Sequence, residues 1–234
     1  MKRLLTVSLL LHLMTAAAIG YAIHRLGGCA YTWTRLQNNT AGSYQHRVQH
    51  FERLDEQPGS IVFLGDSQVA QAEWHELFGD QPTVLNRGIA GESTQGVLAR
   101  LPEILRHKPL KIFLLVGAND LIFGQKPADI ALVYRTVVQK IRTDSPDTEL
   151  YLQSVLPINN EQRNTGTSNA EIDALNAQIA QIARDFALPF IDLGTPLKDA
   201  DGHLAVKFSQ DGLHLNGVGY AVWKKSIEQY GLSN

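Results

Sequence analysis

The sequence predicts a three-layer α/β domain in which parallel strands lie between two layers of helices. Short apolar runs alternate with stretches of helical periodicity, the pattern of a parallel sheet covered on both faces. The runs are mostly apolar and do not alternate, as is typical of doubly covered strands; they are Ile61–Leu64, Val84–Leu85, Ile112–Val116, Leu150–Val155 and Phe190–Ile191. The 234 residues, 44% of them hydrophobic, suit one such domain with an additional segment.

Apolar spacing and capping residues predict the helices between these strands. Residues 44–57 have the spacing of an amphipathic helix that precedes the first strand. Ser168 with Glu171 forms a capping-box pattern at the start of a later helix, and Asn216 is the expected N-cap of the last one. Pro102 interrupts another helical pattern, so two short helices or a kink are expected there.

Charge and cysteine content exclude several classes of protein. The formal net charge is -2 and the Lys and Arg residues form no cluster, so nucleic acid is not an expected partner. The single Cys can form neither an internal disulfide nor a Cys-rich zinc site.

The N-terminus contains an uncharged, largely apolar segment at residues 4–23. In helical form its twenty residues reach about 30 Å, the thickness of a hydrocarbon core. Lys2 and Arg3 precede the segment and Arg25 follows it, which favours a cytoplasmic N-terminus and export of the rest. The chain is therefore expected to be periplasmic or in the cell envelope, with membrane contact through this segment only.

Three interpretations of this segment remain open. It is an uncleaved anchor, a signal peptide with a cleavage site near Ala16–Ala18, or a lipoprotein leader that ends before Cys29. The predicted organisation is a signal peptide or membrane anchor at 1–28, a linker and amphipathic helix at 29–58, and a catalytic domain at 59–234.

Chemically capable residues follow the expected strands. Ligands of open α/β sheets bind beyond the carboxyl ends of the strands. Ser67, Gly88 and Asn119 each lie just after one of the first three strands, and Asp211 and His214 lie just before the last helix. A hydroxyl, backbone N–H groups, an amide and a carboxylate–imidazole pair are the groups that acyl transfer requires.

Each group has an expected role in that chemistry. Ser67 needs a base to accept its proton during attack, and His214 can serve as that base. Asp211 can accept from Nδ1 of His214 and hold the useful tautomer. The expected donors to the developing oxyanion are the backbone N–H groups of Ser67 and Gly88 and the side-chain amide of Asn119.

Three further features allow two interpretations each. Arg87 could meet an anionic substrate or be an ordinary ion-paired arginine, and Asp201 with His203 is a rival Asp/His pair. Residues 156–167 could border the substrate pocket or form a mobile surface loop.

The segments Gly65-Asp66-Ser67, Asn86–Gly91, Gly117–Asp120 and Asp211–His214 resemble the four blocks of the SGNH (GDSL-type) hydrolases. The resemblance extends from about Ser60 to Tyr220. It implies a flavodoxin-like five-stranded sheet of order 2-1-3-4-5, no cofactor or metal, and catalytic roles for Ser67, Gly88, Asn119, Asp211 and His214. The first two blocks are most similar to the platelet-activating-factor-acetylhydrolase-like branch, whose members commonly remove small acyl groups.

The resulting hypothesis is an exported serine esterase that removes a small acyl group, acetyl in the first instance, from a carbohydrate or lipid ester. The same residues would serve an O-acyltransferase or a lysophospholipase or thioesterase with long-chain preference. A non-catalytic glycan-binding envelope module is the alternative outside enzymology.

Overall fold

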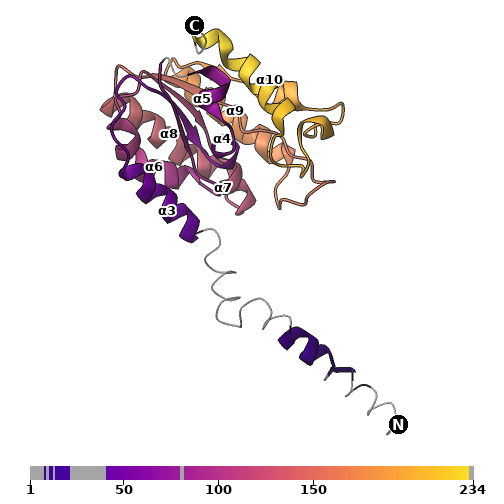
Figure 1. Ribbon diagram of the computed structural model, residues 1–234. Helices are drawn as coiled ribbons and strands as arrows, with labels where there is room; N and C mark the ends of the chain where they lie inside the picture. The colour runs from indigo at the N-terminus through magenta and orange to yellow at the C-terminus, as the bar shows by residue number, and fades with distance from the viewer. Residues whose placement is uncertain (1–7, 9–10, 13, 22–40, 80–81, 232–234) are drawn as a thin grey trace. The chain divides into compact units, whose positions relative to one another are not determined.

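The computed structural model describes residues 8, 11–12, 14–21, 41–79 and 82–231 (Figure 1). The chain divides into two compact units, residues 1–46 and 47–234. In the first unit, residues 14–21 are helical. Cys29 and the rest of residues 29–40, the first part of the predicted linker at 29–58, lie outside the described residues, so the anchor, signal and lipoprotein interpretations stay predictions.

Five parallel strands form the sheet of the second unit, in the order β2-β1-β3-β4-β5. This confirms the expected order and the flavodoxin-like α/β fold. The strands are β1 (Ile61–Gly65), β2 (Val84–Gly88), β3 (Lys111–Leu115), β4 (Glu149–Gln153) and β5 (Phe190–Ile191). In register, Gly65 lies beside Gly88 on one neighbour and Leu115 on the other, so the first three strands end at the same level.

Alternate residues of the strands supply two separate cores. Val62 and Leu64 face a cluster built with α6 (Thr94–Leu105), α8 (Pro127–Asp144) and α9 (Asn169–Asp185). Phe63 faces the other cluster, with α4 (Ser67–Ala70), α5 (Trp74–Phe78) and α10 (Gly217–Ile227). There the rings of Phe63 and Trp74 stack with centroids 3.8 Å apart. Two covered faces explain why the strand sequences are apolar without alternation.

The helices follow the expected pattern with two differences. The capping box of Ser168 and Glu171 opens α9, and Asn216 caps α10 by accepting from two backbone N–H groups. The first helix, α3 (Ala41–Glu52), ends before residue 57. Pro102 does not divide α6, which is one helix from Thr94 to Leu105. The proline lies in its last turn, so little helix remains beyond the hydrogen bond that it removes.

The remaining elements are short. α7 (Ala118–Ile122) follows β3, and the 3₁₀ helices are η1 (Thr195–Leu197), η2 (Val206–Phe208) and η3 (Glu228–Tyr230). Within the described ranges, no helix combines the length and apolar content needed to cross a membrane.

Candidate active site

Ser67 is the first residue of α4, directly after β1. The preceding residue, Asp66, caps this helix, and its Oδ1 accepts from the Gln68 backbone N–H at 3.0 Å. Asp66 is fully buried, and burial raises its pKa to about 7, with the nearby charges of Glu92 and Asp120 adding to the effect. The cap holds the Ser67 hydroxyl at the carboxyl edge of the sheet.

Ser67, His214 and Asp211 form a continuous chain of contacts. Ser67 Oγ lies 3.1 Å from His214 Nε2, and His214 Nδ1 lies 2.8 Å from Asp211 Oδ2. An ionised carboxylate only accepts hydrogen bonds, so the ring proton belongs on Nδ1. Nε2 of the neutral ring is then free to accept the Ser67 proton. The structure thus brings Ser67 into contact with His214, which lies 147 positions later in the chain.

Asp211 is held in its ionised form by its neighbours. Burial opposes the charge, but hydrogen bonds from the backbone and side chain of His214 and the backbone of Leu213 outweigh it and hold the pKa of Asp211 well below its ordinary value. Oδ1 accepts from the backbone N–H groups of His214 at 2.8 Å and Leu213 at 3.0 Å. The acidic partner of the imidazole is therefore both oriented and charged at neutral pH.

Asn119 lies in the first turn of α7 and points toward the loop after β2. Its Nδ2 donates to the Glu92 carbonyl at 2.9 Å. The amide nitrogen carries two hydrogens, so one remains for another acceptor. The next residue, Asp120, accepts from both the backbone and the hydroxyl of Thr94, which fixes α7 against α6.

The expectation that Gly88 offers a free backbone N–H is not met. That N–H donates to Asn86 Oδ1 at 2.9 Å, and the residue is buried. A Cβ at this position would lie 2.2 Å from the backbone nitrogen of Ala70. Glycine is needed here because α4 crosses β2 at close range, which is a packing requirement.

Gly91, three residues later, is exposed and adopts a φ of 78°. Among the described residues its N–H has no hydrogen-bond partner, and the adjacent Glu92 carbonyl is the one that accepts from Asn119. Sequence reasoning noted this glycine only as the end of a block. The signal that could have found it is the left-handed turn that an Ala-Gly pair after a strand permits.

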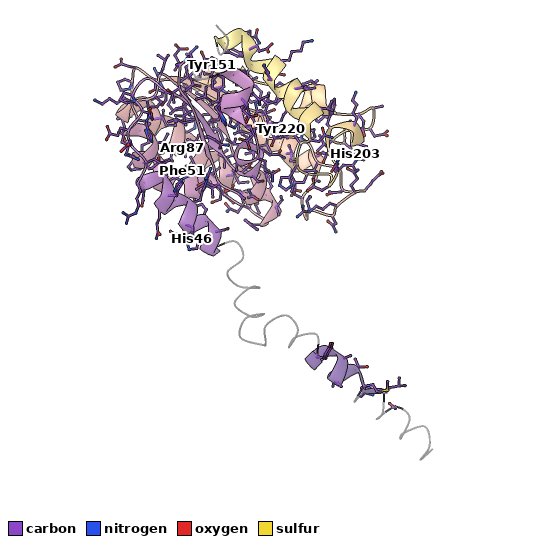
Figure 2. All side chains as sticks on the ribbon, viewed as in Figure 1. His46, Phe51, Arg87, Tyr151, His203 and Tyr220 are labelled. Atoms are coloured by element: carbon purple, nitrogen blue, oxygen red, sulfur yellow. The ribbon has the colours of Figure 1, made fainter. Side chains whose placement is uncertain are left out.

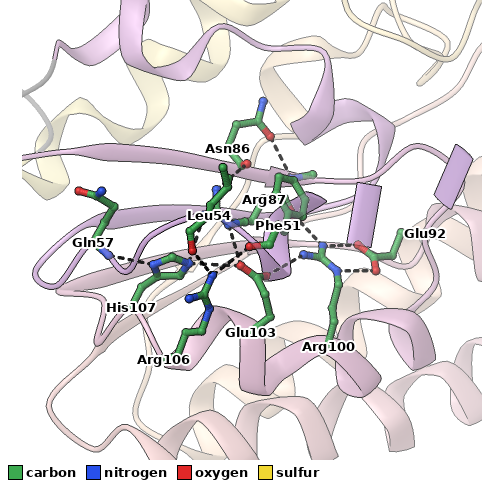
Figure 3. A network of polar contacts seen from close by, with 11 residues as sticks. Phe51, Leu54, Gln57, Asn86, Arg87, Glu92, Arg100, Glu103, Arg106 and His107 are labelled. Carbon is green, nitrogen blue, oxygen red and sulfur yellow. Dashed lines mark hydrogen bonds and ion pairs between the residues drawn. The ribbon is translucent and has the colours of Figure 1, made fainter. Parts of the chain in front are cut away.

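Arg87 is an internal ion-pairing residue and does not face a substrate. Its side chain is 4% exposed; Nε donates to Glu103 Oε1 at 3.1 Å, and the guanidinium lies over the Phe51 ring (Figures 2 and 3). In the same network Arg100 pairs with Glu92, and His107 Nδ1 accepts from the Gln57 backbone N–H at 3.0 Å (Figure 3). The network ties α3 and α6 to the loop that follows β2.

Residues 156–167 are packed against the loop that carries the imidazole. The Asn159 backbone N–H donates to the Gly212 carbonyl at 2.7 Å, and Asn159 is 3% exposed. Arg163 Nη1 reaches Asp211 Oδ2 at 3.2 Å. The loop therefore borders the site, and sequence reasoning missed Arg163 because an arginine in a polar loop has no distinguishing pattern.

The rival pair is not at the site. Figure 2 labels His203. It lies between η1 and η2, where its backbone N–H donates to Asp199 Oδ1 at 2.9 Å. The imidazole of His214 instead borders a hollow of about 410 Å³ lined by Gln71, Gln210, Asp211, His214, Leu215 and Asn216. No group of three or more His, Cys, Asp or Glu side chains in the described ranges is arranged to hold a metal ion.

An open parallel α/β sheet with a serine, an imidazole and a carboxylate in contact at its carboxyl edge defines a class, the serine-dependent acyl-transfer enzymes. The particular family follows from sequence: the chain belongs to the GDSL-like Lipase/Acylhydrolase family, whose model matches residues 59–222.

Curated relatives and a solved structure agree with this membership. The chain is 28% identical to platelet-activating factor acetylhydrolase IB subunit alpha2 of Rattus norvegicus over 83% of this chain and 85% of that protein. It is 28% identical to thioesterase 1/protease 1/lysophospholipase L1 of Escherichia coli (strain K12), over 67% of this chain and 76% of that protein. A structure from Streptococcus pneumonia, assigned as a platelet activating factor, superposes with a TM-score of 0.78 at 29% identity and covers 87% of this chain and 99% of that one. The protein is accordingly a carboxylic ester hydrolase of the GDSL type.

Proposed function

We propose that the protein is an exported serine esterase that removes a small acyl group, acetyl in the first instance, from a carbohydrate or lipid ester. The observation that carries the proposal is the Ser67–His214–Asp211 chain of contacts, with 3.1 Å between Oγ and Nε2 and 2.8 Å between Nδ1 and Oδ2. The acetyl preference is supported by the name of the rat relative, a platelet-activating factor acetylhydrolase. Export is supported by the charge pattern around residues 4–23.

In the proposed mechanism, Ser67 Oγ attacks the acyl carbon while His214 Nε2 takes its proton. The tetrahedral intermediate collapses when the C–O bond to the alcohol breaks and the imidazolium returns that proton to the leaving oxygen. Water then attacks the acyl-enzyme in the same way, with His214 as base, and releases the acid and free Ser67. Asp211 stabilises the imidazolium in both halves and keeps its own charge.

Three donors would stabilise the oxyanion. They are the Ser67 N–H, which has no intrahelical acceptor at the start of α4, the remaining Nδ2 hydrogen of Asn119, and the N–H of Gly91. We assign Gly91 in place of Gly88 because the Gly88 N–H already donates to Asn86. Residues 59–234 would form the catalytic domain, residues 1–28 the signal peptide or membrane anchor, and residues 29–58 the linker and amphipathic helix, whose Phe51 is buried beneath Arg87.

A fluorophosphonate probe and a panel of esters test the proposal. Wild type should be labelled at Ser67, and Ser67→Ala should lose labelling and at least about 10³-fold in ester turnover. Ser226→Ala is the matched control, since its hydroxyl donates to the Val222 carbonyl within α10. Folded wild type that neither reacts with the probe nor hydrolyses any ester would refute an active esterase and favour a binding module.

The choice of esters tests the substrate. p-Nitrophenyl esters from acetyl to long acyl chains, alongside acetylated sugars, should show the highest kcat/KM for acetyl. A long-chain preference would instead place the protein with thioesterases and lysophospholipases, as in the name of the Escherichia coli relative. New ester formed in excess of free acid when a sugar acceptor is present would show an acyltransferase.

A further inference from the structure

Gln68, the residue after the proposed nucleophile, uses every one of its polar atoms within the protein. Its side chain is buried, with the residue 4% exposed. The backbone N–H donates to Asp66 Oδ1 at 3.0 Å, and the backbone carbonyl accepts from Tyr220 Oη at 2.7 Å. Gln68 is therefore fixed from both sides by α10 and by the cap of α4.

The amide of Gln68 bonds to the backbone on both sides of His214. Nε2 donates to the Leu213 carbonyl at 2.6 Å, and the Leu215 N–H donates to Oε1 at 3.3 Å. The residue before and the residue after the imidazole are thus connected to the residue directly after Ser67. This two-point contact links segments 147 positions apart in the chain.

We propose that Gln68 is a positioning residue, which holds the backbone of His214 so that Nε2 stays within reach of Ser67 Oγ. The inference rests on the proposed esterase function. His214 must accept a proton from Oγ and return it to the leaving alcohol, so the Oγ–Nε2 distance of 3.1 Å has to persist through both transfers. Two other contacts restrain the loop that carries His214: Asp211 accepts from the His214 N–H, and the Asn159 N–H donates to the Gly212 carbonyl. Neither contact connects this loop to α4.

The contact requires one donor and one acceptor on the same uncharged side chain. The Leu213 carbonyl needs an N–H and the Leu215 N–H needs an oxygen, and a primary amide of this length supplies both. Methionine has nearly the same shape and supplies neither. An ionised glutamate supplies the acceptor but faces the Leu213 carbonyl with a second oxygen.

The decisive variant is Gln68→Met, measured for kcat and KM separately on the best ester of the panel. Because a small misplacement of a catalytic group costs rate rather than binding, kcat should fall about 10- to 100-fold while KM changes less than about threefold. Gln153→Met is the matched control. Gln153 is a second fully buried glutamine, and its Oε1 accepts from Trp223 Nε1 at 2.7 Å. It should lower Tm and leave the kcat of the folded protein unchanged.

Gln68→Glu adds a readout that general destabilisation would not produce. The charged and titratable groups around this position are Asp66 at the cap of α4, Asp211 and His214 in the loop before α10, and Tyr220 on α10. Dividing the variant's kcat by that of wild type at each pH removes the titrations that both proteins share. The ratio should be low at pH 8 and rise as pH falls, because the protonated introduced carboxyl can donate to the Leu213 carbonyl again.

The outcomes separate this inference from the function on which it rests. Wild type that lacks turnover and probe labelling overturns the proposed esterase. Active wild type, with Gln68→Met within twofold of its kcat, overturns the role of Gln68 alone. Equal loss of kcat in Gln68→Met and Gln153→Met, or a flat pH ratio for Gln68→Glu, also overturns it, since either result shows an unspecific effect on folding.

Discussion

Arg163 Nη1 donates to Oδ2 of Asp211 across 3.2 Å, and that oxygen also faces the imidazole of His214. Both members of the Arg163–Asp211 pair are partly exposed, with 51% and 41% of their side chains accessible. The guanidinium therefore shares the charge that would otherwise act on the imidazole alone, while water weakens its effect.

Removing the guanidinium should change catalysis only slightly. In Arg163→Met, Asp211 Oδ2 keeps its contact with His214 Nδ1 and loses the guanidinium. An exposed ion pair contributes less than about 1 kcal/mol, so kcat/KM should change by less than about fivefold, and by less still at high salt. Steady-state ester hydrolysis at low and high salt measures the change, with Arg142→Met on the exposed face of α8 as the control. A loss of more than about tenfold would contradict this weak electrostatic role of Arg163.

Asn119→Ala should lower kcat about 10²- to 10³-fold with a small change in KM, because it removes the proposed oxyanion donor, which would act in the transition state. The measurement is steady-state hydrolysis of the best ester. Asn86→Ala is a useful comparison, since Asn86 donates to the Ala70 and Ala72 carbonyls and accepts from Gly88. If Asn119→Ala retains wild-type kcat, its assigned role is wrong.

Gly88 at the end of β2 and Gly91 in the loop after it should differ in what they contribute to stability. Gly88→Ala places a Cβ 2.2 Å from a backbone nitrogen of Ala70, so we expect a loss of ~3 kcal/mol or more in the free energy of unfolding. Gly91→Ala meets no atom within 4 Å and costs only the positive φ, ~1 kcal/mol. Urea unfolding of both variants provides the comparison. Equal losses would show that close packing of α4 on β2 does not explain Gly88.

Asp66 should make the wild-type protein less stable as pH rises. Its pKa is raised from 3.8 to about 7 in the folded protein by burial. Between these values the unfolded chain releases the proton and the folded chain keeps it, so the free energy of unfolding falls from about pH 4 to pH 7 and then levels off. Asp66→Asn can still cap α4 and lacks this titration.

The difference in stability between Asp66→Asn and wild type should therefore move in favour of the variant by ~2–4 kcal/mol between pH 4 and pH 8. Urea unfolding at a series of pH values measures it. Asp120, whose pKa burial also raises, is present in both proteins, so its contribution cancels to first order. A pH-independent difference would mean that Asp66 is ionised in the folded protein throughout.

Local signals in the sequence predicted the elements that depend on neighbouring residues. The capping box of Ser168 and Glu171 and the N-cap Asn216 are short-range hydrogen-bonding patterns, and both are present as expected. Pro102 shows the limit of such reasoning. Its ring blocks one helical hydrogen bond, but its place in the last turn leaves α6 intact. The extent of α3 was overestimated for a related reason, since apolar spacing does not specify where a helix stops.

The sequence by itself determined the fold class and the family and indicated candidates for the acyl-transfer chemistry, because strand and helix periods and the four blocks are patterns of consecutive residues. The tertiary structure decided which of those residues have hydrogen-bonding groups that are not already paired within the protein. The Gly88 N–H donates to Asn86, and the Arg87 guanidinium pairs with Glu103. Arg163 and Gln68 contact the loop that carries Asp211 and His214. These hydrogen bonds join residues from 2 to 145 positions apart in the chain. They depend on how the strands and loops pack, and no local pattern in the chain encodes them.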